Sequence, residues 1–418
     1  METRLADFVR GTAEGLEAEA ILRKCVHCGF CNATCPTYQI LGDELDGPRG
    51  RIYLMKMLLE GSKATHKTQQ HLDRCLTCRN CETTCPSGVQ YGRLLDVVRP
   101  IADKRAGRGL FDHLQRFILA AVIPRRRLFA FLLRIGRRLR PVLPRTWASK
   151  IPPMMEHTLA PPAARRSPHR RRMLALTGCV QPALAPEVNI AAARVLDRLG
   201  MELVEAPGAG CCGALRFHLG RHRAALRDMR RNIDAWWPYI KQGVEAIVIT
   251  ASGCGVSVKE YGHWLRHDQR YAARAARISQ LTRDVGEVVA QERVALRELL
   301  KRLPLPEMKV AYQAPCTLQH GQKLPGLVET LLAECGFQLT EVGDAHRCCG
   351  SAATYSLLQP ALSQTLRDNK LAALTAGGPE RILTANIGCQ LHLQSGTPLR
   401  VQHWIELLDQ LLSGRAAV

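Results

Sequence analysis

Residues 24–38 of the chain read KCVHCGFCNATCPTY, and residues 74–88 read RCLTCRNCETTCPSG. Each stretch contains four cysteines in the pattern C-x2-C-x2-C-x3-C, and proline follows the last one. A loop with a thiolate at every third residue can wrap three irons of one cubane, because Fe(II/III) prefers sulfur ligands. The proline then ends the loop by fixing its backbone. We therefore expect a helical N-terminal domain of the ferredoxin type that holds two [4Fe-4S] clusters.

The fourth cysteine of each stretch points away from the cluster that the other three bind. In two-cluster ferredoxins this cysteine ligates the neighbouring cluster, so the ligands are expected to cross between the two motifs. Cluster 1 is then predicted to bind Cys25, Cys28, Cys31 and Cys85. Cluster 2 is predicted to bind Cys75, Cys78, Cys81 and Cys35. Structural zinc is the alternative, but the C-x2-C pairs of zinc sites are usually separated by about a dozen residues or more.

The segment between the two motifs is predicted to form a helix that begins near Pro48. Ile52, Met55 and Leu59 follow it at helical spacing. Arg49 and Arg51 in this helix are candidates to offset the charge of a cluster. An ordinary solvated or capping role for these two arginines is the alternative.

The C-terminal part of the chain contains a second, more widely spaced cysteine pattern that occurs twice. The first set is Cys179, Cys211, Cys212 and Cys254, and the second set is Cys316, Cys348, Cys349 and Cys389. The offset between the sets is 137 residues and shortens to 135 at the last cysteine. In both sets the adjacent pair is followed by glycine. This pattern indicates an internal duplication.

Short apolar segments alternate with helical patterns in each copy. The segments predicted as strands are 173–178, 201–206 and 245–250 in the first copy, and 308–313, 337–342 and 380–385 in the second. Such alternation predicts a Rossmann-like α/β domain whose parallel sheet is covered by helices, with ligands beyond the carboxyl ends of the strands. All eight cysteines follow predicted strands, and packing alone does not require this arrangement.

The residues alone do not decide the role of these eight cysteines. Four thiolates at one sheet edge can hold a metal or a further cluster, form a redox disulfide, or persist from an ancestor that used them. Cys335 has no counterpart in the first copy and is interpreted as a buried small hydrophobe. Gly208, Gly210 and Gly213 match a dinucleotide-binding fingerprint. We reject that reading because the second copy does not repeat the first two glycines.

A strongly basic segment separates the two cysteine systems. Residues 104–172 contain 18 lysines and arginines against two acids, a net +16 of the chain's +21. Two amphipathic helices broken at Pro124 are predicted here, the second with Leu128, Leu132 and Ile135 on its apolar face. Such a helix can lie on an anionic membrane surface, dock on a partner, or simply connect two domains. Residues 149–172, rich in proline and arginine, are predicted to form an extended linker.

Length and composition set the remaining limits. The 418 residues predict several domains. We divide the chain into 1–103 (ferredoxin-type), 104–172 (basic helices and linker), 173–305 (first cysteine-rich repeat) and 306–418 (second repeat). The N-terminus lacks an apolar signal core, and the longest apolar runs are too short for a membrane span. We expect a cytoplasmic location with reduced thiols, and no binding of nucleic acid, because no recognition module accompanies the basic charge.

Both cysteine systems together resemble the iron-sulfur subunits of bacterial glycolate oxidase, also called glycolate dehydrogenase. The resemblance runs nearly end to end and is carried by CVHCGFCNATCPTYQILGDELDGPRGRIYL, TASGCGVSVKEYG, CCGSAATY and TANIGCQLHL. It implies an electron-transfer subunit of an oxidoreductase complex, in which flavoprotein subunits containing FAD oxidise glycolate to glyoxylate and D-lactate to pyruvate. It further implies transfer to a membrane acceptor such as quinone, and peripheral attachment to the cytoplasmic face of the inner membrane.

Related families provide the rival interpretations. An iron-sulfur subunit of anaerobic glycerol-3-phosphate or lactate dehydrogenase is one, and a reductase of disulfides or quinones with its own centre in the repeats is another. A basic scaffold or nucleic-acid-binding protein with structural zinc is a third. The cysteine-rich subunit of heterodisulfide reductase ends each repeat with C-x2-C, but here Ser257 and His392 occupy the fifth position. This departure puts an unusual five-cysteine cluster in doubt.

Overall fold

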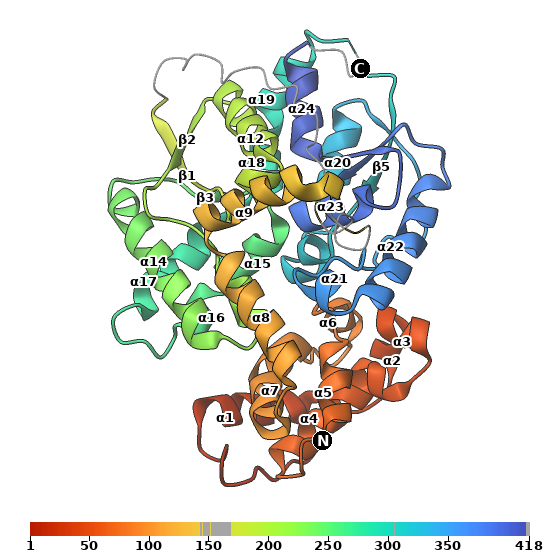
Figure 1. Cartoon of the computed structure of the whole chain (residues 1–418). Coiled ribbons are helices and arrows are strands. Elements are labelled where there is room, and N and C mark those ends of the chain that lie inside the picture. Colours follow the sequence, from red (N-terminus) through yellow and green to blue (C-terminus); the bar gives the residue numbers. More distant parts are fainter. Residues whose placement is uncertain (143, 145–150, 152–168, 305, 415–418) are drawn as a thin grey trace.

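The computed structural model describes residues 1–142, 144, 151, 169–304 and 306–414. In Figure 1 the N-terminal helices lie at one end of the molecule, and two α/β repeats lie side by side at the other. This arrangement confirms the predicted fold class, a helical ferredoxin-type region followed by a duplicated parallel-sheet domain.

Short helices build the N-terminal domain around the two cysteine motifs. They are α1 (Ala13–Lys24), α2 (Phe30–Ala33), α3 (Pro36–Leu41), α4 (Pro48–Leu59), α5 (His66–Asp73), α6 (Asn80–Thr84) and α7 (Tyr91–Ala106), with a 3₁₀ turn at Glu44–Asp46. Pro48 begins α4, and Ile52, Met55 and Leu59 of this helix are buried in the domain core. The helix predicted between the motifs is therefore confirmed.

Two further helices, α8 (Leu110–Val122) and α9 (Arg126–Leu139), flank Pro124 as predicted, and a 3₁₀ turn follows at Arg140–Val142. Ion pairs connect helix α8 and the residue Arg108 just before it to the N-terminal domain. Arg108 and Arg116 both contact Asp73, at 2.8 and 2.9 Å, and both contact Asp112. The residues of the predicted extended linker lie largely outside the described residues.

Each repeat contains a four-stranded parallel sheet, and the strand order is the same in both. The strands of the first are β1 (Arg171–Leu176), β2 (Met201–Glu205), β3 (Ile247–Ile249) and β4 (Thr282–Asp284), in the order β2-β1-β3-β4. Those of the second are β5 (Lys309–Gln313), β6 (Gln338–Leu339), β7 (Arg381–Thr384) and β8 (Arg400–His403), in the order β6-β5-β7-β8. The shared order is the structural counterpart of the duplication in the sequence.

Helices surround both sheets. In the first repeat these are α11 (Gln181–Leu184), α12 (Pro186–Arg198), α13 (Ala214–His218), α14 (His222–Lys241), α15 (Ser252–Lys259), α16 (Tyr261–Trp264), α17 (Ala272–Leu281), α18 (Val285–Gln291) and α19 (Arg293–Leu300). In the second they are a π-helical turn (Thr317–Gly321), α20 (Leu327–Glu334), α21 (Tyr355–Leu358), α22 (Pro360–Thr375), α23 (Ile387–Gln394) and α24 (Trp404–Leu412).

Several predicted strand limits were wrong. β1 begins at Arg171, inside the predicted linker, because Arg171 and Arg172 pair with the first residues of β2. β6 has two residues where six were predicted, because it is an edge strand that pairs only with β5. β4 and β8 were not predicted at all. Each has at most four residues, and strands this short carry little periodic signal.

The two repeats share one apolar core. The largest buried cluster includes Val195 and Leu196 of α12 together with Trp404 and Leu408 of α24. Nε2 of His403 also lies 2.8 Å from the carbonyl oxygen of Thr250, across the boundary between the repeats. The repeats therefore form one packed unit against which the N-terminal domain rests.

Candidate iron-sulfur centres

The first candidate centre, cluster site 1, is a cavity between the first cysteine motif and the end of the second. Its wall contains all four cysteines predicted for cluster 1, Cys25, Cys28, Cys31 and Cys85, and Cys81 also reaches it. Pro48 and Ile52 of α4 close one side. Cys28 is the one exposed cysteine among the eight of the two motifs, all of which the structure describes.

The second candidate centre, cluster site 2, is a cavity between the second cysteine motif and the first turn of α4. Its wall contains the four cysteines predicted for cluster 2, Cys35, Cys75, Cys78 and Cys81. The structure thus brings the fourth cysteine of each motif to the cavity formed by the other motif. This is the crossed arrangement that the spacing predicts.

The same backbone turn brings the first three cysteines of each motif together. His27 and Gly29 have φ angles of 59° and 87°, and the matching Thr77 and Arg79 have 55° and 61°. Left-handed backbone at non-glycine residues is uncommon, and it is often found where a site requires it. Here it reverses the chain between successive cysteines, so that their sulfur atoms face one cavity.

The electrostatics of these thiols fit an iron-sulfur cluster. Burial raises the pKa of Cys31 to about 11, and it raises the pKa of Cys78 and Cys81 well above the usual value. Four such thiols ionise together only if a cation compensates their charge, as iron does. Arg51 and Arg79 are among the residues that line cluster site 2, and no aspartate or glutamate is. Both the sulfur donors and the surrounding cations therefore suit a [4Fe-4S] group.

Arg51 is a buried cation beside cluster site 2. Its side chain is 1% exposed, and its Nη1 lies 4.0 Å from Sγ of Cys35. Its Nε donates to the carbonyl oxygen of His71 at 2.7 Å, and its Nη2 lies 3.3 Å from Oδ1 of Asp46. Arg49, by contrast, is 37% exposed and pairs with Glu44 beside cluster site 1. The two arginines that the sequence singled out therefore differ in burial.

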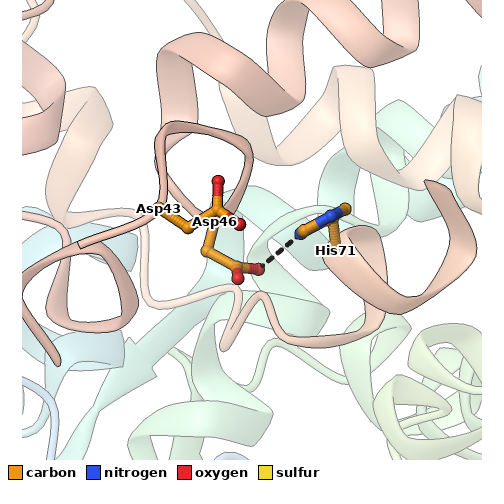
Figure 2. Close-up of side chains that lie close together, drawn as sticks. All are labelled: Asp43, Asp46 and His71. Carbon is orange, nitrogen blue, oxygen red and sulfur yellow. Dashed lines mark hydrogen bonds and ion pairs between the residues drawn. The ribbon is translucent and has the colours of Figure 1, made fainter. Parts of the chain in front are cut away.

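Asp46 organises the polar groups around Arg51. Figure 2 shows its carboxylate directed at Nδ1 of His71, at a distance of 3.1 Å, with Asp43 nearby. These three side chains have the spacing of a metal site. However, Arg51 and Arg74 already neutralise the Asp46 carboxylate, with Nη1 of Arg74 at 2.7 Å. We interpret the group as an ion-pair network that holds Arg51 in place.

The four cysteines of the first repeat form one connected group, the first quartet. Each of Cys179, Cys211 and Cys212 contacts the next, and Sγ of Cys212 lies 3.4 Å from Sγ of Cys254. A hydrogen bond to Cys211 and burial raise the pKa of Cys179 well above its usual value. The hydroxyl of Tyr261 donates to the Cys212 carbonyl at 2.8 Å and holds the Cys-Cys turn.

The second repeat contains the equivalent group, the second quartet. Sγ of Cys316 lies 3.8 Å from Sγ of Cys348, and the contacts continue through Cys349 to Cys389. These Sγ–Sγ separations of 3.4 and 3.8 Å in the two quartets are longer than a disulfide bond, and all 17 cysteines of the chain are free. At the fifth position, Nε2 of His392 lies 3.0 Å from the hydroxyl of Ser363.

The second quartet lies against cluster site 2. Burial raises the pKa of Cys78 above its usual value, and the nearby thiol of Cys316 raises it further. Leu76, beside Cys78 in the chain, packs in one apolar cluster with Cys348 and Tyr355. Cluster site 2 and the second quartet are therefore direct neighbours.

The second quartet in turn connects to the first. The hydroxyl of Ser252 lies 2.7 Å from that of Thr317, which follows Cys316 in the chain. Ser252 precedes Cys254 of the first quartet by two residues. The second quartet therefore adjoins both cluster site 2 and the loop that carries Cys254 of the first quartet.

The polar residues that join the N-terminal domain to the second repeat were not predicted from the sequence. Nδ1 of His320 lies 2.9 Å from the hydroxyl of Thr83, and the hydroxyl of Tyr355 donates to the carbonyl of Arg74 at 3.1 Å. A comparison of the two copies could have identified His320 and Tyr355, because these residues differ between the copies. The first copy has Ala183 and His218 at the two matching positions, so these side chains are not common to both repeats.

Cys335 lies apart from all four sites. It is 3% exposed and packs in the core shared by the repeats, which confirms its interpretation as a buried hydrophobe. Among the described residues, no helix has both the length and the apolar character needed to cross a bilayer.

Comparison with known protein families agrees with this organisation. A family model described as a 4Fe-4S dicluster domain matches residues 21–89. A model described as a cysteine-rich domain matches twice, at residues 173–259 and 310–394. Both cluster sites fall within the first match, and both quartets fall within the second pair.

Whole-chain comparisons identify curated relatives. The chain is 53% identical over 412 residues to the glycolate oxidase iron-sulfur subunit of Escherichia coli K12, covering 99% of both chains. It is 32% identical over 403 residues to the probable glycolate oxidase iron-sulfur subunit of Bacillus subtilis, covering 90% of this chain and 89% of the relative. Lactate utilization protein A of Anoxybacillus flavithermus is 25% identical over 240 residues, which is 55% of this chain and 96% of that protein.

Proposed function

This chain belongs to the family of glycolate oxidase iron-sulfur subunits, and from that premise we propose that it carries electrons from a glycolate-oxidising flavoprotein to an acceptor in the membrane. Oxidation of glycolate to glyoxylate releases two electrons and two protons. A flavin accepts both electrons and returns them singly, which is the form that [4Fe-4S] clusters carry when bound. The flavin belongs to partner subunits, and this chain contributes the conducting path.

The ligand assignment is part of this proposal. Cys25, Cys28, Cys31 and Cys85 bind one cluster, and Cys35, Cys75, Cys78 and Cys81 bind the other. The observation that carries the assignment is that each cavity is lined by the first three cysteines of one motif together with the fourth cysteine of the other. Two zinc sites would not need the motifs to cross in this way, because each could be completed within its own stretch.

Both quartets are proposed as redox centres that hold a further cluster or metal. The support is the convergence of four sulfur atoms in each repeat and the contact between the second quartet and cluster site 2. A conducting path through all four sites would extend from the surface near Cys28 to the first quartet. The rival view, a quinone or disulfide reductase with its catalytic centre in the repeats, uses the same sulfur atoms as its active site.

The acceptor is proposed to be quinone, with the chain attached to the membrane surface. Support comes from α8, which turns Arg116 and Ala120 inward and exposes its apolar face. Leu110, Phe111 and Leu114 on that face are 92%, 80% and 55% exposed. The following helix α9 adds arginines, and residues 113–142 contain eight arginines and no acidic residue. Apolar side chains beside cations match an anionic lipid surface.

The test is anaerobic purification of the chain together with its flavoprotein partners, followed by assay of iron, acid-labile sulfide and glycolate-dependent dye reduction. Two interacting [4Fe-4S] signals in the EPR spectrum are expected. Cys28→Ser should remove one signal, whereas Cys335→Ser, at a buried cysteine outside the sites, should remove none. Zinc without iron or sulfide would contradict the proposal, and intact signals without any glycolate activity would favour the glycerol-3-phosphate or lactate relatives.

A further experiment separates the relay from the rival reductase. Cys349→Ser should slow transfer to quinone while glycolate still reduces both ferredoxin-type clusters. Turnover of quinone or disulfide by the isolated chain, lost in Cys349→Ser, would support the reductase.

A further inference from the structure

The two cysteine motifs present equivalent surfaces, because residues 26–30 and 76–80 are related by a shift of 50 positions and adopt the same left-handed turns. Val26 corresponds to Leu76, and Phe30 corresponds to Asn80. In each motif these two residues flank the second cysteine, Cys28 or Cys78. The contacts of Leu76 and Asn80 can therefore be compared with those of Val26 and Phe30.

In the second motif this surface is covered by the next sulfur site. Leu76 is 5% exposed and packs with Cys348 and Tyr355 of the second repeat. Asn80 is 3% exposed, and its Nδ2 lies 3.3 Å from the carbonyl oxygen of His346. This contact surface is where one redox site adjoins another.

In the first motif the equivalent surface is open. Val26 is 70% exposed and Phe30 is 62% exposed, on either side of the exposed Cys28. Tyr53 of α4 extends the apolar area. It is 49% exposed, and its ring makes an edge contact with His27 at 6.3 Å between centroids. Large apolar and aromatic side chains gathered on a surface are typical of protein interfaces.

The charges around this surface distinguish it from the apolar face of α8. Arg49 and Glu44 at its edge neutralise each other, with Nε and Oε1 2.6 Å apart. No run of arginines like that of α9 adjoins it in the sequence. An apolar surface with an exposed cluster ligand and no run of arginines fits a protein that exchanges electrons better than it fits anionic lipid.

We propose that Val26, Phe30 and Tyr53 form the docking surface for the flavin-bearing subunit, so that electrons enter this chain at cluster site 1. The proposal rests on the proposed function and adds the place where the partner binds. The flavin takes two electrons from glycolate and delivers them one at a time across this surface, while the two protons pass to solvent. The internal equivalence with Leu76 and Asn80 indicates the orientation, with the partner's cofactor opposite Cys28 as the second quartet is opposite Cys78.

The test uses the co-expressed complex with its clusters and flavin. Val26→Asp and Phe30→Asp should each weaken the association of the flavoprotein by about tenfold or more, as for hot-spot residues at interfaces. The rate at which glycolate reduces the clusters should fall in parallel, whereas dithionite should still reduce them. Val294→Asp is the matched control, because Val294 is 77% exposed on α19, in the first repeat. It should leave the flavoprotein association unchanged.

Substitutions next to the ligands Cys25 and Cys31 could prevent cluster assembly, so a second measurement is independent of them. A photocrosslinking amino acid at Tyr53 should link this chain to the flavoprotein, and one at Val294 should not. The inference is overturned if variants with intact EPR signals retain flavoprotein and glycolate-dependent reduction, or if the Tyr53 probe links nothing. Absence of the clusters from the unsubstituted complex would instead refute the proposed function.

Discussion

The hydroxyl of Thr83 and Nδ1 of His320 lie 2.9 Å apart, on opposite sides of the boundary between the N-terminal domain and the second repeat. Nε2 of His320 lies 3.1 Å from the carbonyl oxygen of His346, so this nitrogen donates and Nδ1 accepts from Thr83. Thr83 stands between Cys81 and Cys85, and His320 follows Cys316 by four residues. This buried histidine therefore joins the loops that carry cluster site 2 and the second quartet.

His320→Ala should lower the free energy of unfolding of the complete chain by about 1–3 kcal/mol, because it removes the hydrogen bonds of His320 to Thr83 and to the His346 carbonyl. Urea unfolding of the cluster-loaded protein measures this change. The exposed His66 is the control, and His66→Ala should cost less than about 0.5 kcal/mol. Equal costs at the two positions would show that the bridge does not stabilise the junction.

Arg51→Gln should shift the reduction potential of the cluster at site 2 to a more negative value. Loss of the cation near Cys35 removes a charge that favours the reduced cluster. The same change should also destabilise the fold by about 3–5 kcal/mol, because the buried Asp46 loses one of its two arginines. EPR at controlled potentials and urea unfolding measure the two effects.

Two further variants serve as comparisons for Arg51→Gln. Arg51→Lys keeps the charge and should shift the potential less than Arg51→Gln. Arg49→Gln changes a half-exposed arginine at cluster site 1 and should have smaller effects on both measurements, since solvent screens its charge. A potential that is unchanged in Arg51→Gln would exclude a tuning role.

Gly350→Ala should destabilise the second repeat more than Gly378→Ala. Both glycines have positive φ angles, 88° and 61°. An added Cβ at Gly378 meets open space, so only the backbone penalty of about 1–2 kcal/mol applies. At Gly350 the Cβ would lie 2.5 Å from the carbonyl oxygen of Ser363, and this overlap adds to the penalty. Thermal unfolding compares the variants, and similar midpoints would contradict the strict need for glycine after Cys348-Cys349.

His403 should make the junction of the repeats sensitive to acid. Burial lowers the pKa of His403 to about 4, and its neutral form donates to Thr250 while Nδ1 accepts from the Ile405 amide. Because the folded state lowers this pKa, neutral His403 contributes its full stabilisation at pH values above about 6.5, the pKa of histidine in the unfolded chain. This stabilisation is lost, at about 1.4 kcal/mol per pH unit, as the pH falls from about 6.5 to 4.

Glu406 acts in the opposite direction, because burial raises its pKa to about 7. The informative quantity is therefore the difference in unfolding free energy between the native chain and His403→Gln, which retains Glu406. That difference should shrink as the pH falls from 7 to 5 in urea titrations of the cluster-loaded protein. A difference that does not change with pH would mean that His403 is not buried in its neutral form.

Phe111→Asp should weaken binding of the chain to vesicles that contain anionic lipid by about tenfold or more, since burial of a phenylalanine contributes about 1.5–3 kcal/mol. Phe111 is 80% exposed, so folding should not change. Sedimentation with vesicles measures the binding, and added salt should reduce it. Val294→Asp again serves as the control. Equal binding of neutral and anionic vesicles, or of Phe111→Asp and the native chain, would argue against α8 as a membrane-binding element.

Much of the fold follows from local pattern. The helix from Pro48, the two helices that flank Pro124 and most strands of the repeats are encoded by apolar spacing and by prolines, which act within a few residues. Strands β4 and β8 escaped prediction because three or four residues carry no clear period. Their position is decided by pairing with β3 and β7.

The amino-acid sequence by itself determined which residue types meet iron and that both cysteine systems are duplicated, because ligand spacing and repetition are properties of the chain. Only the tertiary structure decided which sites adjoin one another, the cover over Cys78 and the open surface around Cys28. The tertiary structure also decided the burial of Arg51 and the hydrogen bond between Thr83 and His320. These features depend on contacts between segments far apart in the chain, which residue spacing does not encode.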